Sequence, residues 1–568
     1  MNPLTALKNY WLLIALILSA LVLGMIGFTQ VFPEFGFLTR CYLTMQLFLI
    51  DSGALDLSET SGGIEGGGVP WSLETARWLA AGLSFYAVFY AASRMLRRSG
   101  DSFRIRGLCG HTVVYGADEV TESFLHEQKA AGRKCVLVSG SDALLKACRA
   151  MGHPAFDLEG GLNHKLDSED LRCAGLSQAY ALYALDAEDA VNLRALLLAT
   201  ELAPTIKKVV LRQDEPSNCD LMQRKEIFGL KDQNVLRVIS VEKLRARMLM
   251  KQNPLEIGSD GQTADAVHLV LPQLGVFEKA VAVQAAFIGH YRNGRQVNLW
   301  LPSTDLRDEL LTEFPKFERC VNLKCLGEEP VRSIEEIGHH VGEGARVTVL
   351  FTHLGPEQAY LKMLRLEERC PNEVGLQVIL RTPSDKALPE SIREHPNIAV
   401  LQDGLGLLGN TVMNEIDRLG RAIHETWYQG NVERIQKAEK KGDSKELYEL
   451  QEKPAFKRWE DLTEAQRDDN RSAGDHIEVK IRAAGLDPKQ SDLEEVWAKL
   501  DSDTLDMLSR MEHERWAAPL WLANWEAGPR DDARRIHNNL VPYDELDQGT
   551  KDYDTEQVKA AVQYLLGE

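Results

Sequence analysis

The pattern of hydrophobic and polar positions divides the chain into three regions. A strongly apolar beginning gives way, near residue 107, to short apolar runs that alternate with helix-like segments. From near residue 419 the chain is made of polar helices punctuated by tryptophan. Runs such as HTVVYG (His111–Gly116) are almost continuously apolar, as in strands buried on both faces of a parallel sheet. Such strands alternating with helices predict a doubly wound α/β sheet.

The α/β region occurs twice, with a period of about 160 residues. The second copy opens with HLVLPQ (His268–Gln273), and the strand VVLRQ (Val209–Gln213) recurs as VILRT (Val378–Thr382). Two further landmarks recur in the same order, GRKCVLVSGSD as GRQVNLWLPSTD and NVLRVIS as NIAVLQD. We therefore predict two tandem Rossmann-like domains with doubly wound parallel sheets, over 107–256 and 257–418.

Residues 1–106 have the composition of a two-span membrane domain. Tyr10–Phe28 carries no charged side chain, and its length of about 19 residues matches the bilayer core, so a spanning helix is expected over about 10–31. A cleaved signal peptide is the competing interpretation. A second span is expected over about 76–96. Arginines follow it and the loop between the spans is acidic, which places both termini in the cytoplasm of a multi-pass inner (plasma) membrane protein.

The apolar segment 35–50 lies between the two predicted spans and is too short to cross a bilayer. It is interpreted either as a re-entrant pore helix or as an amphipathic helix on the membrane face. A potassium selectivity filter needs a TVGYG-like segment, which the sequence lacks. The glycine-rich stretch SGGIEGGG (Ser61–Gly68) is predicted to be flexible.

Composition and charge exclude several classes of function. The 568-residue chain has a net charge of -19, which argues against a nucleic-acid partner. Its nine cysteines show no paired spacing, as is typical of reduced cytosolic thiols. The His-Glu pairs lack the second histidine of a zinc helix, and no nucleophile elbow occurs. We therefore expect no metal site, no catalytic residues and no enzymatic activity.

Both sheet domains depart from the dinucleotide fingerprint G-x-G-x-x-G at the first turn. The first copy keeps Gly116 but has Asp118 at the second glycine position, and the second copy keeps only Gly275. At the end of the second strand, where a carboxylate would bind a ribose, stand Ser139 and Pro302. From the residues alone, these departures favour a scaffold or an altered ligand over ordinary NAD binding.

Four polar residues mark the ends of later strands. Asp186 and Asp189 follow the fourth strand, where they either contact a ligand or cap the next helix. Arg212 and Arg381 occupy equivalent ends of the fifth strands. An arginine there either binds a phosphate or carboxylate or forms a salt bridge between the two copies.

The segment His111–Thr200, most clearly in ALDAEDAVNLRALLLA (Ala184–Ala199), resembles the N-terminal domain of TrkA-type potassium-transport regulators. This domain is similar to the regulator-of-potassium-conductance (RCK) domains attached to two-span channels. The resemblance implies a Rossmann fold, face-to-face pairing of sheet domains and a nucleotide or ion ligand. NAD(H), ATP, ADP and a signalling nucleotide are the candidate cofactors.

The C-terminal region contains a second duplication, with halves expected over 419–500 and 501–568. RAIHETWY (Arg421–Tyr428) followed by RWEDLTEAQRDDNR parallels RMEHERWA (Arg510–Ala517) followed by VPYDELDQGTKDYD. Each half has a His-Glu pair followed by an aromatic residue, and then a Trp or Tyr before a leucine-ended acidic turn. The predicted fold is all-α.

The second half resembles the ryanodine-receptor repeat (RyR) module. The resemblance is carried by HERW (His513–Trp516), GPRDD (Gly528–Asp532), LVPYDEL and KDYD, with Trp525 and His537. It implies a small helical module used for binding or assembly without catalysis, and in bacterial proteins one that senses a small, nucleotide-derived ligand.

Five residues of this RyR-like half form the candidate ligand site. Their aromatic faces and guanidinium suit stacking on a base and pairing with a phosphate. The alternative is that the tryptophans are core residues and the charged residues form internal ion pairs. The five are His513, Trp516, Trp525, Arg530 and Tyr543.

The leading hypothesis is a ligand-responsive membrane protein, an oligomeric channel-like effector gated by its cytoplasmic domains. Membrane lipid, further copies of the chain and a phosphate-bearing ligand are its expected partners, and alanine at Arg530 or Arg212 is expected to weaken ligand binding. The first alternative is a non-conducting, membrane-tethered regulator or scaffold of a potassium transporter. The second is an NAD-dependent enzyme, for which a catalytic constellation is missing from the sequence.

Overall fold

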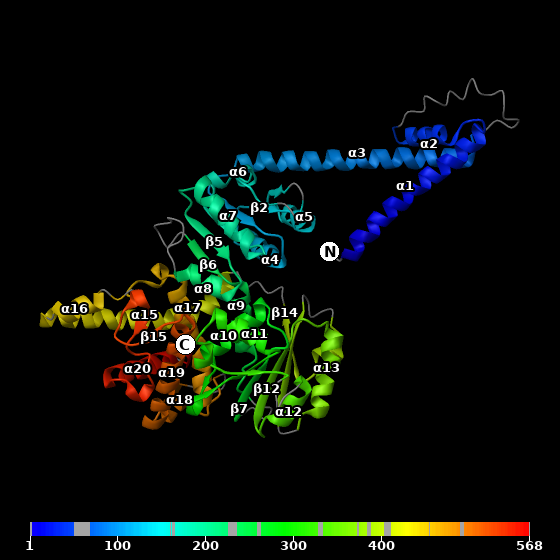
Figure 1. The fold of residues 1–568 in the computed structure, drawn as a ribbon. Helices are drawn as coiled ribbons and strands as arrows, with labels where there is room; N and C mark the ends of the chain where they lie inside the picture. The colour runs from blue at the N-terminus through cyan, green and yellow to red at the C-terminus, as the bar shows by residue number, and fades with distance from the viewer. Residues whose placement is uncertain are drawn as a thin grey trace. The chain divides into compact units, whose positions relative to one another are not determined.

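A computed structural model of the chain contains two compact units, Met1–Gly107 and Leu108–Glu568 (Figure 1). The acidic and glycine-rich loop predicted between the two spans lies outside the residues that the structure describes. These are 3–49, 69–158, 161, 165–224, 236–257, 263–327, 333–371, 374–382, 388–402, 410–442, 444–451, 453, 455–488 and 493–566, with the side chains of some helical residues, among them 90–99, left undescribed.

The N-terminal unit is built from the helices α1 (Pro3–Val31), α2 (Phe37–Gln46) and α3 (Trp71–Arg106). Where α1 meets α3, a Cβ on Gly27 would lie 2.8 Å from the backbone nitrogen of Leu73. Small residues let helix backbones approach this closely, as in membrane bundles. The segment predicted as a re-entrant or interfacial helix forms α2 and a short 3-10 turn. The core of the unit joins all these elements and consists of Phe28, Leu43, Leu47, Leu73, Ala76 and Ala80.

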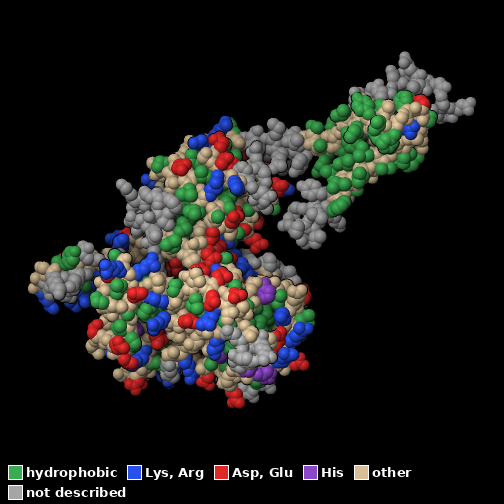
Figure 2. Space-filling model, in the orientation of Figure 1, with side chains coloured by type: hydrophobic (Ala, Val, Ile, Leu, Met, Phe, Trp, Pro, Cys, Tyr) green, Lys and Arg blue, Asp and Glu red, His purple; other side chains and the backbone are tan. Residues whose placement is uncertain are grey.

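Hydrophobic side chains cover the outside of this unit as well as its core (Figure 2). On α1, Trp11, Leu18 and Val22 are more than half exposed, and on α3 so are Trp78 and Phe89. Soluble surfaces rarely carry an apolar face of this extent. By length and composition, Leu13–Val31 is able to cross a membrane. No second helix among the described residues meets the same criteria. The second span, which was expected over about 76–96 within α3, therefore stays a prediction.

The first sheet occupies the start of the second unit and is entirely parallel, with strand order β3-β2-β1-β4-β5-β6. Its strands are β1 (Thr112–Tyr115), β2 (Cys135–Ser139), β3 (Ala155–Asp157), β4 (Ala181–Ala184), β5 (Lys208–Arg212) and β6 (Leu236–Ile239). The connecting helices are α4 (Glu119–Ala130), α5 (Asp142–Ala150), α6 (Ser168–Cys173), α7 (Asp189–Leu202) and α8 (Pro216–Arg224). The continuous apolar runs of the sequence are buried here because helices cover both faces.

The second sheet repeats the same topology, in the order β11-β10-β7-β12-β13-β14. Its strands are β7 (Ala266–Val270), β10 (Asn298–Leu301), β11 (Asn322–Cys325), β12 (Ala345–Phe351), β13 (Gly375–Thr382) and β14 (Ile398–Gln402). Helix α9 (Val241–Gln252) joins the two sheets, and α10 (Val276–Ile288) follows β7. The prediction of two Rossmann-like parallel sheets is thereby confirmed.

The C-terminal region is helical, as predicted. Its longer helices are α15 (Asn410–Lys441), α17 (Glu464–Ala483), α19 (Ser502–Leu522) and α20 (Gln548–Leu566), with α16 (Ser444–Gln451) and α18 (Leu493–Lys499) between them. Because α15 begins at Asn410, the expected domain boundary at residue 419 falls inside a helix.

A row of ion pairs attaches α17 to the first sheet domain and to α9. Acidic side chains on one face of α17 meet basic side chains of β6 and α9, and the contributing groups are largely buried. The pairs are Arg237–Glu464 at 2.8 Å, Lys243–Asp468 at 2.9 Å and Arg247–Asp475 at 2.9 Å. Removal of one member of such a buried pair leaves an uncompensated charge, so these contacts fix how the helical module is seated.

Candidate functional site

The carboxyl-end edge of the first sheet is closed by the side chains of the chain itself. At Gly116 a Cβ would clash with the hydroxyl of Thr121 and lie 3.2 Å from the backbone nitrogen of Asp186, so this turn requires glycine. Asp118 caps α4 and accepts a hydrogen bond of 3.0 Å from the backbone nitrogen of Thr121. In a dinucleotide-binding domain this helix N-terminus would hold the pyrophosphate. Here a carboxylate already occupies that position.

Arg212 is 4% exposed and holds this arrangement together. Its Nη1 atom pairs with Asp118 and its Nε atom lies 2.6 Å from Asp214. Nη1 also donates to the carbonyl of Leu185 at 3.1 Å. Burial alone would lower the pKa of Arg212, but the carboxylates of Asp214 and Asp118 raise it, so the guanidinium stays charged. In the structure the ion-pair partners of Arg212 both lie within the first copy, so the intercopy salt bridge is not formed by Arg212, and its role toward a ligand stays a prediction.

The other predicted residues of this edge also have internal partners. Ser139 is buried, and its hydroxyl accepts a hydrogen bond from the backbone of Ser141 at 3.1 Å. Asp186 accepts from the backbone nitrogen of Glu188 at 3.0 Å. Asp189 lies in the first turn of α7, yet its carboxylate accepts from the backbone nitrogens that precede α8 (Asp214 at 2.8 Å and Glu215 at 3.0 Å). Asp189 thus lies in the first turn of α7, as expected from the sequence, but its carboxylate binds the backbone before α8 and not that of α7.

At the equivalent turn of the second sheet, a carboxylate of the chain again binds the helix N-terminus. Gly275 precedes α10, and its backbone nitrogen donates to the Glu278 carboxylate at 3.0 Å. Arg381, at the equivalent of Arg212, lies 3.1 Å from Glu242 of α9. Arg381 thus links the second sheet to the helix that follows the first, which is the intercopy salt bridge considered from the sequence. Neither helix N-terminus offers an anion site without displacement of a carboxylate.

A cavity of about 860 Å³ lies between α19 and the second sheet domain. His513 and Tyr543, both predicted as ligand residues, line it, and their ring centres are 6.0 Å apart. The Nε2 atom of His513 donates to the carbonyl of Val541 at 2.9 Å, which fixes the ring. Glu514, next to His513 in the chain, also lines the cavity, and burial raises its pKa.

The three other predicted residues, Trp516, Trp525 and Arg530, do not line this cavity. Trp516 packs behind His513, with ring centres 5.6 Å apart, and its other neighbour is His537 at 5.0 Å. Trp525 packs on His537 at 6.2 Å. Arg530 is exposed and forms a two-point ion pair with Asp532, at 3.0 and 3.2 Å. A neutralised surface arginine of this kind is a poor phosphate ligand.

The opposite wall of the cavity comes from the second sheet domain and could not be inferred from local sequence. Arg319 lines the cavity and lies 5.5 Å from the ring centre of Trp521. Among the described residues, the Arg319 guanidinium forms no ion pair. By contrast, Arg510 is neutralised by Asp506 at 2.8 Å and Asp544 at 2.6 Å. Arg319 is therefore the cation on this wall best placed to receive an anionic group.

The first helical half repeats the histidine arrangement of the second. His424 donates to the carbonyl of Lys457 at 2.8 Å, as His513 does to Val541. His424 also lies 5.7 Å from the ring of Trp427, compared with 5.6 Å between His513 and its tryptophan. The duplication predicted from the sequence therefore extends to individual hydrogen bonds.

The aromatic residue of the acidic turn is equivalent in the two halves as well. Arg421 lies 5.8 Å from the ring centre of Trp459, and Arg510 lies 4.8 Å from that of Tyr543. His424 and Trp459 line an open cavity of about 730 Å³. The residues lining it all come from α15 and the turn around Trp459, so it lacks the facing wall that Arg319 contributes in the other half.

Comparison with known protein families agrees with this architecture. Residues 112–235 match the TrkA-N domain family, and residues 487–567 match the RyR domain family. The chain therefore carries a TrkA-N domain, which contains most of the first sheet, and a C-terminal RyR domain, which contains α19 and α20. No curated protein matches the chain.

Solved structures provide a more distant comparison. The chain is similar to the GsuK channel bound to NAD, with 12% identity, a TM-score of 0.34, and coverage of 73% of this chain and 84% of that one. It is also similar to GsuK bound to ADP, with 14% identity, a TM-score of 0.34, and coverage of 72% and 99%. The GsuK RCK domain matches with 12% identity and a TM-score of 0.35, covering 54% and 78%.

Proposed function

We propose that the chain is a non-enzymatic membrane protein whose cytoplasmic domains sense a small nucleotide and pass the signal to its apolar N-terminal helices. The observation that carries this proposal is the cavity between the RyR domain and the second sheet domain. It presents an unneutralised arginine, Arg319, on one wall and the rings of His513 and Tyr543 on the other. Its volume of about 860 Å³ is in the range of small-molecule sites.

The chemistry of this cavity suits a ligand with both an aromatic base and a phosphate. An arginine without a carboxylate partner gains most from a charge-assisted hydrogen bond to phosphate, whereas rings stack on a base. The carboxylates of Glu514 and Asp503 also line the cavity and can accept from ribose hydroxyls or base amino groups. NAD(H), ADP, ATP and related signalling nucleotides combine these features.

Signal transfer follows from the position of the ligand between two domains. A molecule that contacts α19 and Arg319 together favours one packing of the RyR domain against the second sheet domain. In the proposed mechanism, oligomers couple this packing to α1 and α3, since a single pair of spans cannot enclose a pore. The alternative, a non-conducting regulator of a potassium transporter, is supported by the TrkA-N domain and uses the same sensing step.

Replacing Arg319 with alanine is expected to weaken nucleotide binding by about tenfold or more, because a hydrogen bond to a charged group contributes roughly 1.5–3 kcal/mol. Calorimetric titration of ADP, ATP and NAD into the full-length protein in detergent measures the affinity. Potassium flux from liposomes, with and without the ligand, measures the output.

Arg307→Ala is the matched control, because Arg307 lies on the same domain and is paired with Glu318 at 2.8 Å. Unchanged binding in Arg319→Ala, or no binding of any of the three nucleotides, contradicts the assignment. Binding without flux favours the regulator over the channel.

The proposed topology places the loop between α1 and α3 outside the cell and the TrkA-N domain inside. Cys173 is exposed on that domain. The substitution Ser58→Cys introduces a thiol into the loop, for comparison with Cys173. A membrane-impermeant maleimide should label the loop thiol in intact cells and Cys173 only in inverted vesicles, with the sites identified by peptide mass spectrometry. Labelling of both thiols from one side would rule out two spans.

A further inference from the structure

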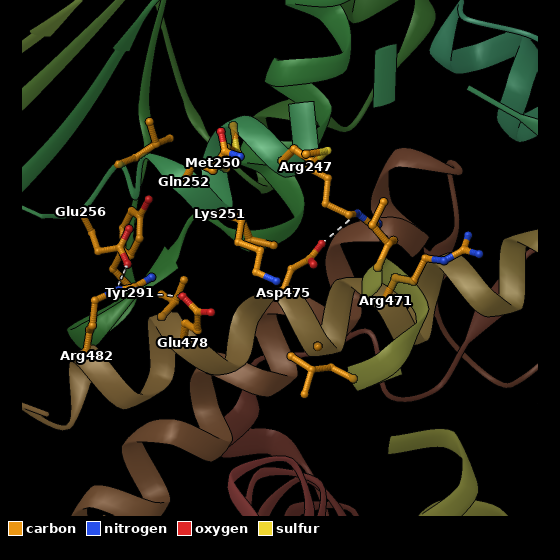
Figure 3. Close-up of a pocket in the computed structure, with 17 residues that line it drawn as sticks. Arg247, Met250, Lys251, Gln252, Glu256, Tyr291, Arg471, Asp475, Glu478 and Arg482 are labelled. Atoms are coloured by element: carbon orange, nitrogen blue, oxygen red, sulfur yellow. Dashed lines mark hydrogen bonds and ion pairs between the residues drawn. The ribbon is translucent and has the colours of Figure 1, made fainter. Parts of the chain in front are cut away.

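A smaller cavity, of about 320 Å³, lies where α9, α10 and α17 meet (Figure 3). It shares no lining residue with the cavity proposed for the nucleotide. Its wall is contributed by the helix that joins the two sheets, by the second sheet domain and by the helical module. A molecule bound there would therefore contact all three at once.

Most of the surface of this cavity is apolar. Leu255, Ile288 and Val479 line it and are each less than a tenth exposed. Two methionines near the end of α9, Met248 and Met250, line it as well. Methionine side chains are unbranched and polarisable, so they adapt to the shape of an apolar partner. The wall thus favours a ligand with a hydrocarbon or aromatic body.

The charged side chains that reach the wall are paired with one another. Arg482 lies 2.7 Å from Glu256 and 3.3 Å from Glu478 (Figure 3). The Nε atom of Arg247 lies 2.9 Å from Asp475. The two terminal nitrogens of Arg247 are buried and do not reach the cavity. This part of the wall therefore offers a ligand neither a free cation nor a free carboxylate.

Two further cations on the wall are also matched by carboxylates. The amine of Lys251 points toward Asp475 (Figure 3). The guanidinium of Arg471 pairs with three carboxylates, which belong to Asp417, Glu464 and Asp468. An ionised ligand would lose its hydration here without gaining an opposite charge, which is costly in a buried site. The electrostatics of the cavity therefore select an uncharged molecule.

Tyr291 contributes an unused hydrogen-bond donor to the wall. It lies in β8 (His290–Tyr291), directly after α10, and is 6% exposed. Within the described part of the chain, its hydroxyl has no hydrogen-bond partner. Burial raises the pKa of Tyr291 well above its ordinary value, so the hydroxyl keeps its proton. Such a donor gains from an acceptor such as a carbonyl oxygen.

We propose that this cavity binds a small, uncharged and largely apolar carbonyl compound, such as an aryl ketone. The carbonyl oxygen accepts a hydrogen bond from the hydroxyl of Tyr291. The body of the molecule covers Leu255, Ile288 and Val479 and removes their surface from water. The volume of the cavity lies at the lower end of the range of small-molecule sites, which suits a compact ligand.

Such a ligand would act on the seating of the helical module. Helices α9 and α17 are joined by the ion pairs Lys243–Asp468 and Arg247–Asp475. A molecule that contacts both helices binds more tightly when they are docked, so its binding favours the docked arrangement. The protein would then combine two inputs, one at the RyR domain and one at this junction.

The test is photolabelling of the full-length protein in detergent with two ketones that share their photochemistry. Benzophenone is uncharged, whereas 4-benzoylbenzoate carries a carboxylate at neutral pH, and ultraviolet light attaches both to nearby C–H bonds. Peptide mass spectrometry should find saturable labelling by benzophenone on α9 and α17. The half-saturating concentration of 4-benzoylbenzoate at these peptides should be at least about tenfold higher, because its charge finds no partner.

Two variants separate the hydrogen bond from the apolar contacts. Tyr291→Phe should raise the half-saturating concentration of benzophenone about threefold or more, through loss of a neutral hydrogen bond. Diphenylmethane has nearly the same shape without the oxygen, and its power to compete should be unchanged by this substitution. Leu419→Trp should abolish the saturable labelling by filling the cavity. Tyr448→Phe, at an exposed position on α16, is the matched control and should behave as the wild type.

Three results overturn the proposal. They are no saturable labelling of α9 or α17 in the wild-type protein, equal half-saturation by the two ketones, and labelling that persists unchanged in Leu419→Trp. An equal response of Tyr291→Phe and Tyr448→Phe refutes the hydrogen bond. Because the nucleotide is titrated separately and its cavity shares no residue with this one, either assignment can fail while the other stands.

Discussion

Replacing Arg471 with methionine is expected to lower the free energy of unfolding of the C-terminal unit by about 3–5 kcal/mol. Arg471 is 2% exposed and lies 2.6 Å from each of Asp417, Glu464 and Asp468. Methionine fills a similar volume but leaves three carboxylates facing one another without their cation. The loss should be visible in the midpoint of urea denaturation followed by tryptophan fluorescence, since most tryptophans lie in the helical module.

Arg307→Met provides the comparison for this variant. The Arg307–Glu318 pair has a similar separation of 2.8 Å, but both side chains are about a third exposed or more. Surface pairs contribute only about 0–1 kcal/mol. Equal midpoints for the Arg471 and Arg307 variants would show that the buried network does not hold the helical module in place.

Acidification from pH 7 to pH 5 is expected to destabilise the protein through its buried histidines. Burial lowers the pKa of His290 to about 4, below the ordinary value near 6.5. The neutral ring contributes its full stability above pH 6.5, and this is lost as the pH falls toward 4, because the unfolded chain binds a proton that the folded chain excludes. The slope is roughly 1.4 kcal/mol per pH unit, or about 2 kcal/mol at pH 5.

Comparison of the wild type with His290→Gln isolates this contribution. Glutamine can still donate to the Ala286 carbonyl, which His290 contacts at 2.9 Å, and carboxylates that titrate in the same range cancel in the difference. The variant should show a shallower decline of the denaturation midpoint between pH 6.5 and pH 5. His339→Gln, at an exposed position, should leave the slope as it is in the wild type. A His290 variant with the wild-type slope would contradict a histidine origin of the acid sensitivity.

The fold was largely predictable because its signals are local and repeated. The short runs that begin at His111 and at His268 are almost continuously apolar, which by itself indicates buried strands. Their recurrence at a fixed period identifies two equivalent sheets. The second duplication was equally readable, since His424 and His513 each sit in the same sequence context. Helix ends were less predictable. Helix α15 begins at Asn410, directly after a glycine-rich stretch at 404–409, whereas the sequence boundary was drawn at the later change to polar helices near residue 419.

The candidate site was only partly predictable because its two walls are distant in sequence. His513 and Tyr543 are marked by the RyR resemblance, but Arg319 enters the cavity only through the packing of the second sheet domain on α19. The same limit applies to Arg212, whose partner Asp118 is far away along the chain. A sequence shows which arginines end a strand, whereas tertiary packing decides which of them are already neutralised.

The carboxylates that cap α4 and α10 compete with any external anion for the helix N-terminus in each sheet domain. A nucleotide that binds at the edge of the first sheet would have to displace the Asp118 carboxylate and pair with Arg212 in its place. Binding would therefore exchange one anion for another and would not simply add a ligand. The exchange would also free the start of α4 from the end of β5. The Asp118 carboxylate would therefore stand in for a ligand anion in the unliganded protein, and its displacement would loosen the contact between α4 and β5.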